Sequence, residues 1–88
     1  MNDARNPILV IEDEPSVIAY LRAVLERSGY TVTAVERGVD ALALLAEGEY
    51  HGIISDMRTP GGVDGADVYA WLQKHRPILA QRLLFITG

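Results

Sequence analysis

The sequence predicts an α/β domain with a parallel sheet between two layers of helices, and three observations support this fold class. Strand-like and helix-like segments alternate along the chain in the order βαβαβαβ. The runs Ile8–Ile11 and Leu83–Ile86 are continuously apolar, as in strands that are buried on both faces. The segments between strands are long enough for helical crossovers, which are right-handed and cover both faces of a parallel sheet.

Length and composition limit the chain to one globular unit. It has 88 residues, 49% of them hydrophobic and 23% charged, which excludes disorder as the default. The absence of cysteine excludes thiolate zinc sites and thiol nucleophiles and fits a reducing compartment. Apolar runs fall far short of the ~20 residues of a membrane span, and no export signal is visible. We therefore expect a cytoplasmic protein with no membrane contact.

The first half of the chain predicts two strands and two helices. Ile8–Ile11 is the first strand, and Pro15 then opens a helix of roughly four turns that stops at Gly29. Tyr30–Val35 is β-branched and partly alternating, which is typical of a strand at a sheet edge. Strong helix formers in Asp40–Ala46 predict a short second helix.

The second half begins with a third apolar strand, Gly52–Ser55. The loop Met57–Val63 contains Pro60-Gly61-Gly62 and is expected to form turns with positive φ rather than a nucleotide cradle. Asp64 and Asp67 have the spacing that caps a third helix, which Pro77 would end. Leu83–Ile86 is predicted to be a fourth buried strand.

Acidic residues follow two of these strands at the point where each strand ends. Glu12 and Asp13 come directly after the first strand, and Asp56 closes the third. If the two strands are neighbours at ~4.8 Å, the three carboxylates crowd one edge of the sheet. Like charges so close together recruit a cation, and an oxygen-only donor set favours Mg²⁺. Glu14 is better explained as an acid at the start of a helix.

The distribution of charge separates this cluster from the rest of the chain. The formal net charge is −4, from twelve acidic and eight basic residues. Four of the acids are Glu12–Glu14 and Asp56, so the remainder of the chain is neutral, with its basic residues scattered singly. Direct binding of nucleic acid needs a basic face and is therefore not expected.

A carboxylate beside Mg²⁺ can act as a nucleophile toward a phosphoryl group and form an aspartyl phosphate. Asp56 is the candidate nucleophile because it is the lone acid at the end of the third strand. The alternative is that the acids only solvate a loop and complement the dipole of the following helix.

Sequence blocks in the same order resemble the receiver domains of bacterial two-component response regulators: Ile8–Pro15, Ile53–Pro60, Asp64-Gly65 and Phe85–Gly88. The resemblance covers nearly the whole chain. It implies the flavodoxin-like receiver fold, a three-layer α/β structure with strand order 2-1-3-4 over the part of the domain present in this sequence.

The resemblance also implies roles for individual residues. Asp56 would accept the phosphoryl group, and Asp13 and Glu12 would bind Mg²⁺, together with the backbone carbonyl of Arg58. The hydroxyl of Thr87 would contact a phosphoryl oxygen and couple phosphorylation to a conformational change. The phosphodonor would be a phosphohistidine on a histidine kinase or a histidine phosphotransfer domain. Catalysis would be limited to the protein's own phosphorylation and dephosphorylation.

The sequence departs from the family pattern in three places. Glu12 stands where the family more often has aspartate, and the stretch Pro60–Gly65 is one residue longer than usual. The family continues with a fourth helix, a fifth strand ending in lysine and a fifth helix, so residues 1–88 are expected to be a receiver domain that is incomplete at the C-terminus. Arg58 is expected to be a solvated or weakly paired loop arginine, with replacement of the missing lysine charge as the alternative.

Two other functions stay open at this point. One is a receiver-like interaction or dimerisation module that does not switch. The other is an Mg²⁺-dependent phosphohydrolase, although 88 residues leave no room for a substrate cap. Without a fifth strand, the apolar edge Leu83–Ile86 would be exposed, which predicts a homodimer through the last strand.

Overall fold

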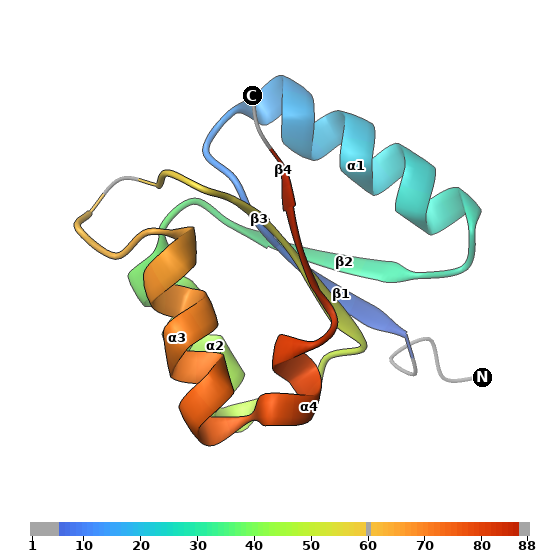
Figure 1. The fold of residues 1–88 in the computed structure, drawn as a ribbon. Helices are drawn as coiled ribbons and strands as arrows, with labels where there is room; N and C mark the ends of the chain where they lie inside the picture. Colours follow the sequence, from blue (N-terminus) through green and yellow to red (C-terminus); the bar gives the residue numbers. More distant parts are fainter. Residues whose placement is uncertain (1–5, 60, 87–88) are drawn as a thin grey trace.

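The computed structural model describes residues 6–59 and 61–86, and its centre is a four-stranded parallel sheet (Figure 1). The strands are β1 (Pro7–Ile11), β2 (Thr31–Val35), β3 (Gly52–Asp56) and β4 (Leu83–Ile86). The helices are α1 (Pro15–Arg27), α2 (Gly38–Glu47), α3 (Gly65–His75) and α4 (Pro77–Ala80). The strand order is β2-β1-β3-β4, which confirms the predicted order. Helix α1 covers one face of the sheet, and α2, α3 and α4 lie on the other (Figure 1).

The register of the sheet brings the carboxyl ends of its strands to one edge. In β1, Ile11 pairs with Val35 of β2 on one side and with Ser55 of β3 on the other. At the end of β3, Asp56 pairs with Ile86 of β4. The residues that follow β1 and the last residue of β3 therefore lie next to each other at the same edge.

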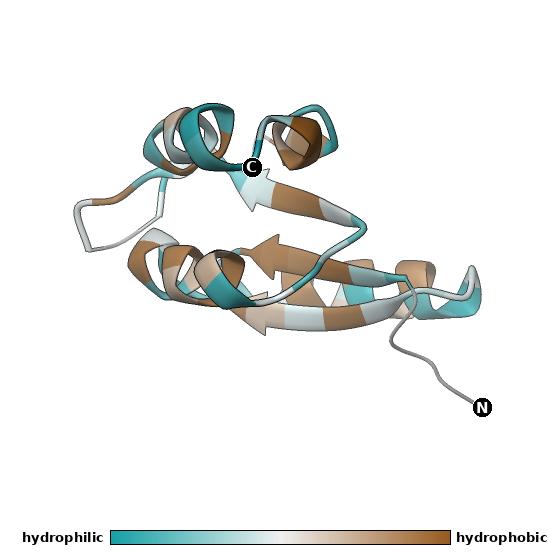
Figure 2. Cartoon of the chain, turned by 90° about the horizontal axis from the view of Figure 1, so that it is seen from below, coloured by the Kyte–Doolittle hydropathy of each residue, from teal (hydrophilic) through white to brown (hydrophobic). Residues whose placement is uncertain are grey.

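The main core lies between the sheet and the layer formed by α2, α3 and α4. Residues Leu9, Ile11 and Ile53 contribute side chains from the two central strands. Leu45 of α2 and Leu72 of α3 cover them and are fully buried. Colouring by hydropathy shows that apolar residues are frequent along the strands (Figure 2). This core is the rigid support for the loops at the carboxyl edge.

The structure differs from the sequence prediction at the start of α2 and in an additional short helix after α3. Helix α2 starts at Gly38, two residues before the expected Asp40, and a Cβ atom on Gly38 would collide with the backbone of Val63. The glycine therefore allows the close approach of a loop that is distant in sequence. Pro77 ends α3 as predicted, but it also opens the additional short helix α4, because proline is favoured at the first helical position.

The start of α3 follows the prediction. Asp64 Oδ1 accepts a hydrogen bond from the Asp67 backbone N–H at 3.0 Å. Asp67 Oδ2 accepts one from the Asp64 N–H at 3.1 Å, which completes a capping box. Together these bonds fix the point at which the loop after β3 becomes helical.

The prediction that β4 is buried along its length is wrong at Leu84, which is 62% exposed. β4 is the last strand in the sheet order, and the paired residue Ile54 on β3 is only half-buried. Leu84 and Ile54 line an open hollow of about 370 Å³ together with Ile8, Gly52 and Arg82. This side of the sheet therefore carries apolar surface that the described part of the chain leaves open to solvent.

Arg76 connects the C-terminal end of α2 to the turn between α3 and α4. Its Nη1 donates to the carbonyl oxygens of Leu45 at 3.0 Å and Gly48 at 2.7 Å. Its Nη2 donates to Glu49 Oε1 at 2.9 Å. A helix leaves its last carbonyls without internal partners, so a cation at this position satisfies them and complements the helix dipole.

We predict that Arg76→Ala lowers the free energy of unfolding by about 1–3 kcal/mol, because it leaves acceptors at the end of α2 without their donor. Arg76→Lys keeps the charge but not the forked geometry, and an intermediate loss is expected. Lys74→Ala on α3 is the control, with a change within about 0.5 kcal/mol expected at this exposed position. Urea denaturation measures all three variants. Equal losses in Arg76→Ala and Lys74→Ala would show that Arg76 has no special role.

Candidate functional site

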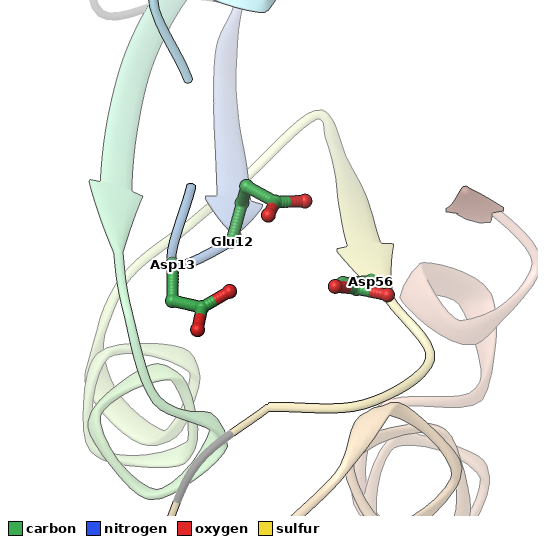
Figure 3. Close-up of side chains that lie close together, drawn as sticks. All are labelled: Glu12, Asp13 and Asp56. Carbon is green, nitrogen blue, oxygen red and sulfur yellow. The ribbon is translucent and has the colours of Figure 1, made fainter. Parts of the chain in front are cut away.

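Three carboxylates meet at the carboxyl edge of the sheet. Glu12 and Asp13 follow β1, and Asp56 is the last residue of β3. One carboxylate oxygen from each residue lies within 4.8 Å of the others. The side chains converge on a common space between the two strand ends (Figure 3). The structure thus brings together the three acids that the sequence placed at one sheet edge.

The backbone at the end of β1 explains this convergence. The Glu12 N–H donates to the Val35 carbonyl at 2.9 Å, so the chain still follows β2 at this residue. The pairing of Ile11 with Ser55 places Glu12 beside Asp56. The chain then turns toward α1, which begins at Pro15. Asp13 lies in this turn and reaches the same space from the solvent side.

The three carboxylates differ in exposure. Glu12 is buried, with 4% of its surface exposed, and its Oε2 accepts a hydrogen bond from the Glu14 N–H at 3.1 Å. Asp56 is half-buried, and Asp13 is exposed. Glu14 is the N-cap residue of α1, and its side chain makes no capping bond. The site therefore has the buried, hydrogen-bonded carboxylate of Glu12 at its base, and it is open to solvent on the side of Asp13.

The donor set fits a hard divalent cation. Within residues 6–59 and 61–86, the ion pairs involve Arg22, Arg37 and Arg76 with other acids, and none reaches the three carboxylates. Mutual repulsion is therefore not offset by a described basic side chain. Mg²⁺ commonly binds one or two carboxylates and keeps several waters, which suits an oxygen-only site that is open on one side.

Of the two other residues in the sequence prediction, the structure describes only Arg58. Arg58 is exposed, and its backbone N–H donates to Asp56 Oδ1 at 3.4 Å. The metal-binding role predicted for the Arg58 carbonyl stays a prediction. Thr87 lies outside the residues that the structure describes, so its predicted contact with a phosphoryl oxygen also stays a prediction.

The loop after β3 has the turn character that its glycines predict. Gly61 and Gly62 have φ values of 94° and 87°. The aliphatic part of Arg37 lies against Gly61, at 3.4 Å from where a Cβ would be. The Arg37 guanidinium forms two hydrogen bonds with Asp40, at 3.0 and 3.2 Å, and these raise the pKa of Arg37. Arg37 is consequently held at the start of α2 as a fixed neighbour of the loop.

No role was assigned to Ser55 from the sequence. Ser55 is fully buried, and its hydroxyl donates to the carbonyl oxygen of Asp56 at 2.7 Å. The available signal was the spacing of two residues from Ile53, which places Ser55 on the same, core-facing side of β3 as this buried residue. Gly65 was treated only as part of a motif, although it lies directly against the same carbonyl.

Comparison with known proteins gives the same fold and family. The family of response regulator receiver domains matches residues 8–88. The transcriptional regulatory protein TcrA of Mycobacterium tuberculosis is 41% identical over 69 residues, which cover 78% of this chain and 27% of TcrA.

Solved receiver domains superpose closely on the chain. The signal receiver domain of a signal transduction histidine kinase from Syntrophus aciditrophicus has a TM-score of 0.81 and 31% identity, and the match covers 93% of this chain and 61% of that one. The receiver domain of a sensor histidine kinase from Pseudomonas aeruginosa has a magnesium ion in its active-site cleft. It gives a TM-score of 0.77 at 28% identity, over 93% of this chain and 65% of that one.

The chain thus spans about a quarter of TcrA and less than two thirds of the Syntrophus receiver domain. The family match nevertheless extends over almost all of the chain. The parallel sheet, its strand order and the acidic edge agree with that match. This chain belongs to the family of response regulator receiver domains, the phosphoacceptor modules of two-component systems.

Proposed function

We propose that Asp56 accepts a phosphoryl group from a phosphohistidine, supplied by a histidine kinase or a histidine phosphotransfer domain, in an Mg²⁺-dependent reaction. The observation that carries this proposal is the convergence of Glu12, Asp13 and Asp56 at the carboxyl edge of the sheet. Asp56 is the acceptor in this arrangement because it ends β3 and is half-buried, whereas only 4% of the Glu12 surface is exposed.

The reaction exchanges a phosphorus–nitrogen bond for a phosphorus–oxygen bond. A carboxylate oxygen of Asp56 attacks phosphorus, and the imidazole of the donor leaves with the electron pair of the broken bond. Hydrolysis of the aspartyl phosphate by water later restores the carboxylate and releases inorganic phosphate. When bound, Mg²⁺ supplies positive charge that offsets the repulsion between the Asp56 carboxylate and the phosphoryl oxygens.

Glu12, Asp13, Asp56 and the carbonyl of Arg58 are the proposed metal ligands. The Glu14 N–H holds Oε2 of Glu12, so the buried carboxylate already faces the space between the strands. Asp13 is exposed, and Mg²⁺ bound there would keep several of its waters on the solvent side. Thr87 is the proposed contact for a phosphoryl oxygen, which would couple phosphorylation to a conformational change.

The proposed phosphodonor assigns this reaction to the cytoplasm. Among the described residues, no helix has the length and apolarity needed to cross a membrane. The basic residues are dispersed singly along the sequence, whereas binding of nucleic acid needs them clustered on one face. The kinase or phosphotransfer domain is therefore the principal partner that we propose for residues 1–88.

We also propose that the 88-residue chain, when studied on its own, forms a homodimer through β4. β4 ends the sheet, and its Leu84 side chain is 62% exposed. An unpaired strand edge invites pairing with a second chain, and two copies of the same edge can pair around a two-fold axis. The apolar hollow beside Leu84 would lie next to this contact.

We predict that Asp56→Asn abolishes incorporation of label from radioactive acetyl phosphate in the presence of Mg²⁺, because the amide cannot act as the nucleophile. Glu14→Gln is the matched control and keeps the labelling rate within about twofold, since this exposed side chain lies outside the cluster and a change of surface charge alone has a small effect. Label retained by the Asp56→Asn variant would place the acceptor at another residue.

We predict that Mg²⁺ stabilises the fold. At a free concentration ten times the dissociation constant, linkage gives about 1.4 kcal/mol, which corresponds to a rise of several degrees in Tm. Asp13→Asn should strongly reduce this rise because it removes one ligand, whereas Glu14→Gln should preserve it. Thermal melting at constant ionic strength, with NaCl replacing MgCl₂, measures the specific effect. An equal rise in the Asp13→Asn variant would contradict the assignment of the metal ligands.

We predict that the parent chain sediments as a dimer at micromolar concentration and that Leu84→Lys shifts it to the monomer, because a charge on this strand opposes edge pairing. Ile78→Lys is the matched control, since Ile78 is equally apolar and 73% exposed on α4. This variant should stay dimeric. A parent chain that is folded and monomeric would rule out the β4 dimer.

A further inference from the structure

Ser55 is a polar residue in the apolar layer beneath the phosphoacceptor. It is 0% exposed, and its paired neighbours on β1 and β4 are Ile11 and Phe85. A hydroxyl in such surroundings costs free energy unless it finds a hydrogen-bond partner. The partner of the Ser55 hydroxyl is the carbonyl oxygen of Asp56, at 2.7 Å. The hydroxyl thus donates its hydrogen bond to the main chain of the proposed acceptor.

The same carbonyl is also in contact with the start of α3. A Cβ atom added to Gly65 would lie 2.6 Å from the Asp56 carbonyl oxygen and 3.1 Å from Ser55 Oγ. The Gly65 N–H donates to the carbonyl of the next residue, Met57, at 3.0 Å. The main chain at Asp56 is therefore confined by the buried hydroxyl on one side and by the first turn of α3 on the other.

We propose that Ser55 is a positioning residue for phosphoryl transfer, which fixes the main chain of Asp56 and so directs its carboxylate toward Glu12 and Asp13. This inference rests on the proposed function of Asp56. Loss of the hydroxyl would free the Asp56 carbonyl to rotate, and the attached side chain would move with it. A displacement of ~1 Å at a reacting group can reduce a rate by about a hundredfold.

A nucleophilic role for Ser55 does not fit these contacts. The side chain is fully buried, and its one described hydrogen bond leads to a carbonyl rather than to a base. A purely packing role would be met by an alanine or cysteine of similar size. The hydroxyl is the chemical feature that distinguishes serine at this position, so the test must separate the hydroxyl from the volume.

The experiment compares Ser55→Ala, Ser55→Cys and Ser55→Thr with the parent chain. Alanine removes the donor, cysteine keeps the volume with a weak donor, and threonine keeps the hydroxyl. Thr59→Val is the matched control, because the Thr59 hydroxyl also donates to a main-chain carbonyl, that of Val63 at 2.6 Å, in the loop after β3 rather than at Asp56. The measurements are the carbonyl ¹³C shift of Asp56 without metal, the Mg²⁺ dissociation constant, and the labelling rate at saturating Mg²⁺.

We expect Ser55→Ala and Ser55→Cys to move the Asp56 carbonyl shift, to raise the Mg²⁺ dissociation constant about three- to tenfold and to slow labelling about ten- to a hundredfold. Ser55→Thr should recover most of the Mg²⁺ affinity and most of the labelling rate. In Thr59→Val, the Mg²⁺ dissociation constant and the labelling rate should both stay within about twofold of the parent values. A folded Ser55→Ala variant that binds Mg²⁺ and is labelled like the parent would overturn the proposal.

Two further outcomes keep this test separate from the test of the proposed function. If Ser55→Ala does not fold, the difference between the cysteine and threonine variants decides, because both retain a γ atom. If the parent chain is not labelled at all, the proposed function fails. The carbonyl shift and the Mg²⁺ affinity then still decide whether Ser55 holds Asp56 in place. If both values are unchanged in Ser55→Ala, the positioning role is refuted. A changed carbonyl shift together with weaker Mg²⁺ binding supports it.

Discussion

The parallel pairing of β1 with β3 is the constraint on which the site depends. The register Ile11–Ser55 places the acids that follow β1 beside the acid that ends β3. Two strands that are driven together by burial of apolar side chains thus carry like charges to the same edge. Burial of apolar surface stabilises the paired strands by ~25 cal/mol per Å² and does not depend on direction. The repulsion between the crowded carboxylates lowers stability at the carboxyl edge, where a bound cation can offset it.

The two ends of the sheet differ in how their polar groups are satisfied, and this difference follows from the pairing of β1 with β3. At the carboxyl edge, Glu14 and Arg58 donate backbone N–H groups to the acids, and the loop after β3 is shaped by hydrogen bonds and positive-φ glycines. At the opposite edge, Arg76 satisfies the end of α2 and ties three helices together. The hydrogen bonds of Arg76 thereby satisfy the backbone at one end of the sheet, whereas the three carboxylates at the other end have no basic partner among the described residues.

The sequence was informative where a local pattern determines the structure. Apolar runs that end in acids predicted the strands and the convergence of Glu12, Asp13 and Asp56, and the Asp64 spacing predicted the capping box. The strand order came from the family resemblance rather than from the pattern of apolar residues. Contacts between distant segments were not predictable, since the need for glycine at Gly38 depends on how close another loop approaches. The Ser55 hydroxyl was missed because its partner is a main-chain carbonyl, which has no sequence signature.

The most direct measurement of the central claim is the chemical location of the phosphoryl group. The chain is treated with acetyl phosphate and Mg²⁺, and the acyl phosphate is then reduced with borohydride, which converts the modified aspartate to homoserine and releases phosphate. Peptide mass spectrometry should find homoserine at residue 56 alone, and only when Mg²⁺ is present. Homoserine derived from Asp13, or modification of Asp56 in a sample from which a chelator has removed Mg²⁺ before acetyl phosphate is added, would contradict the account.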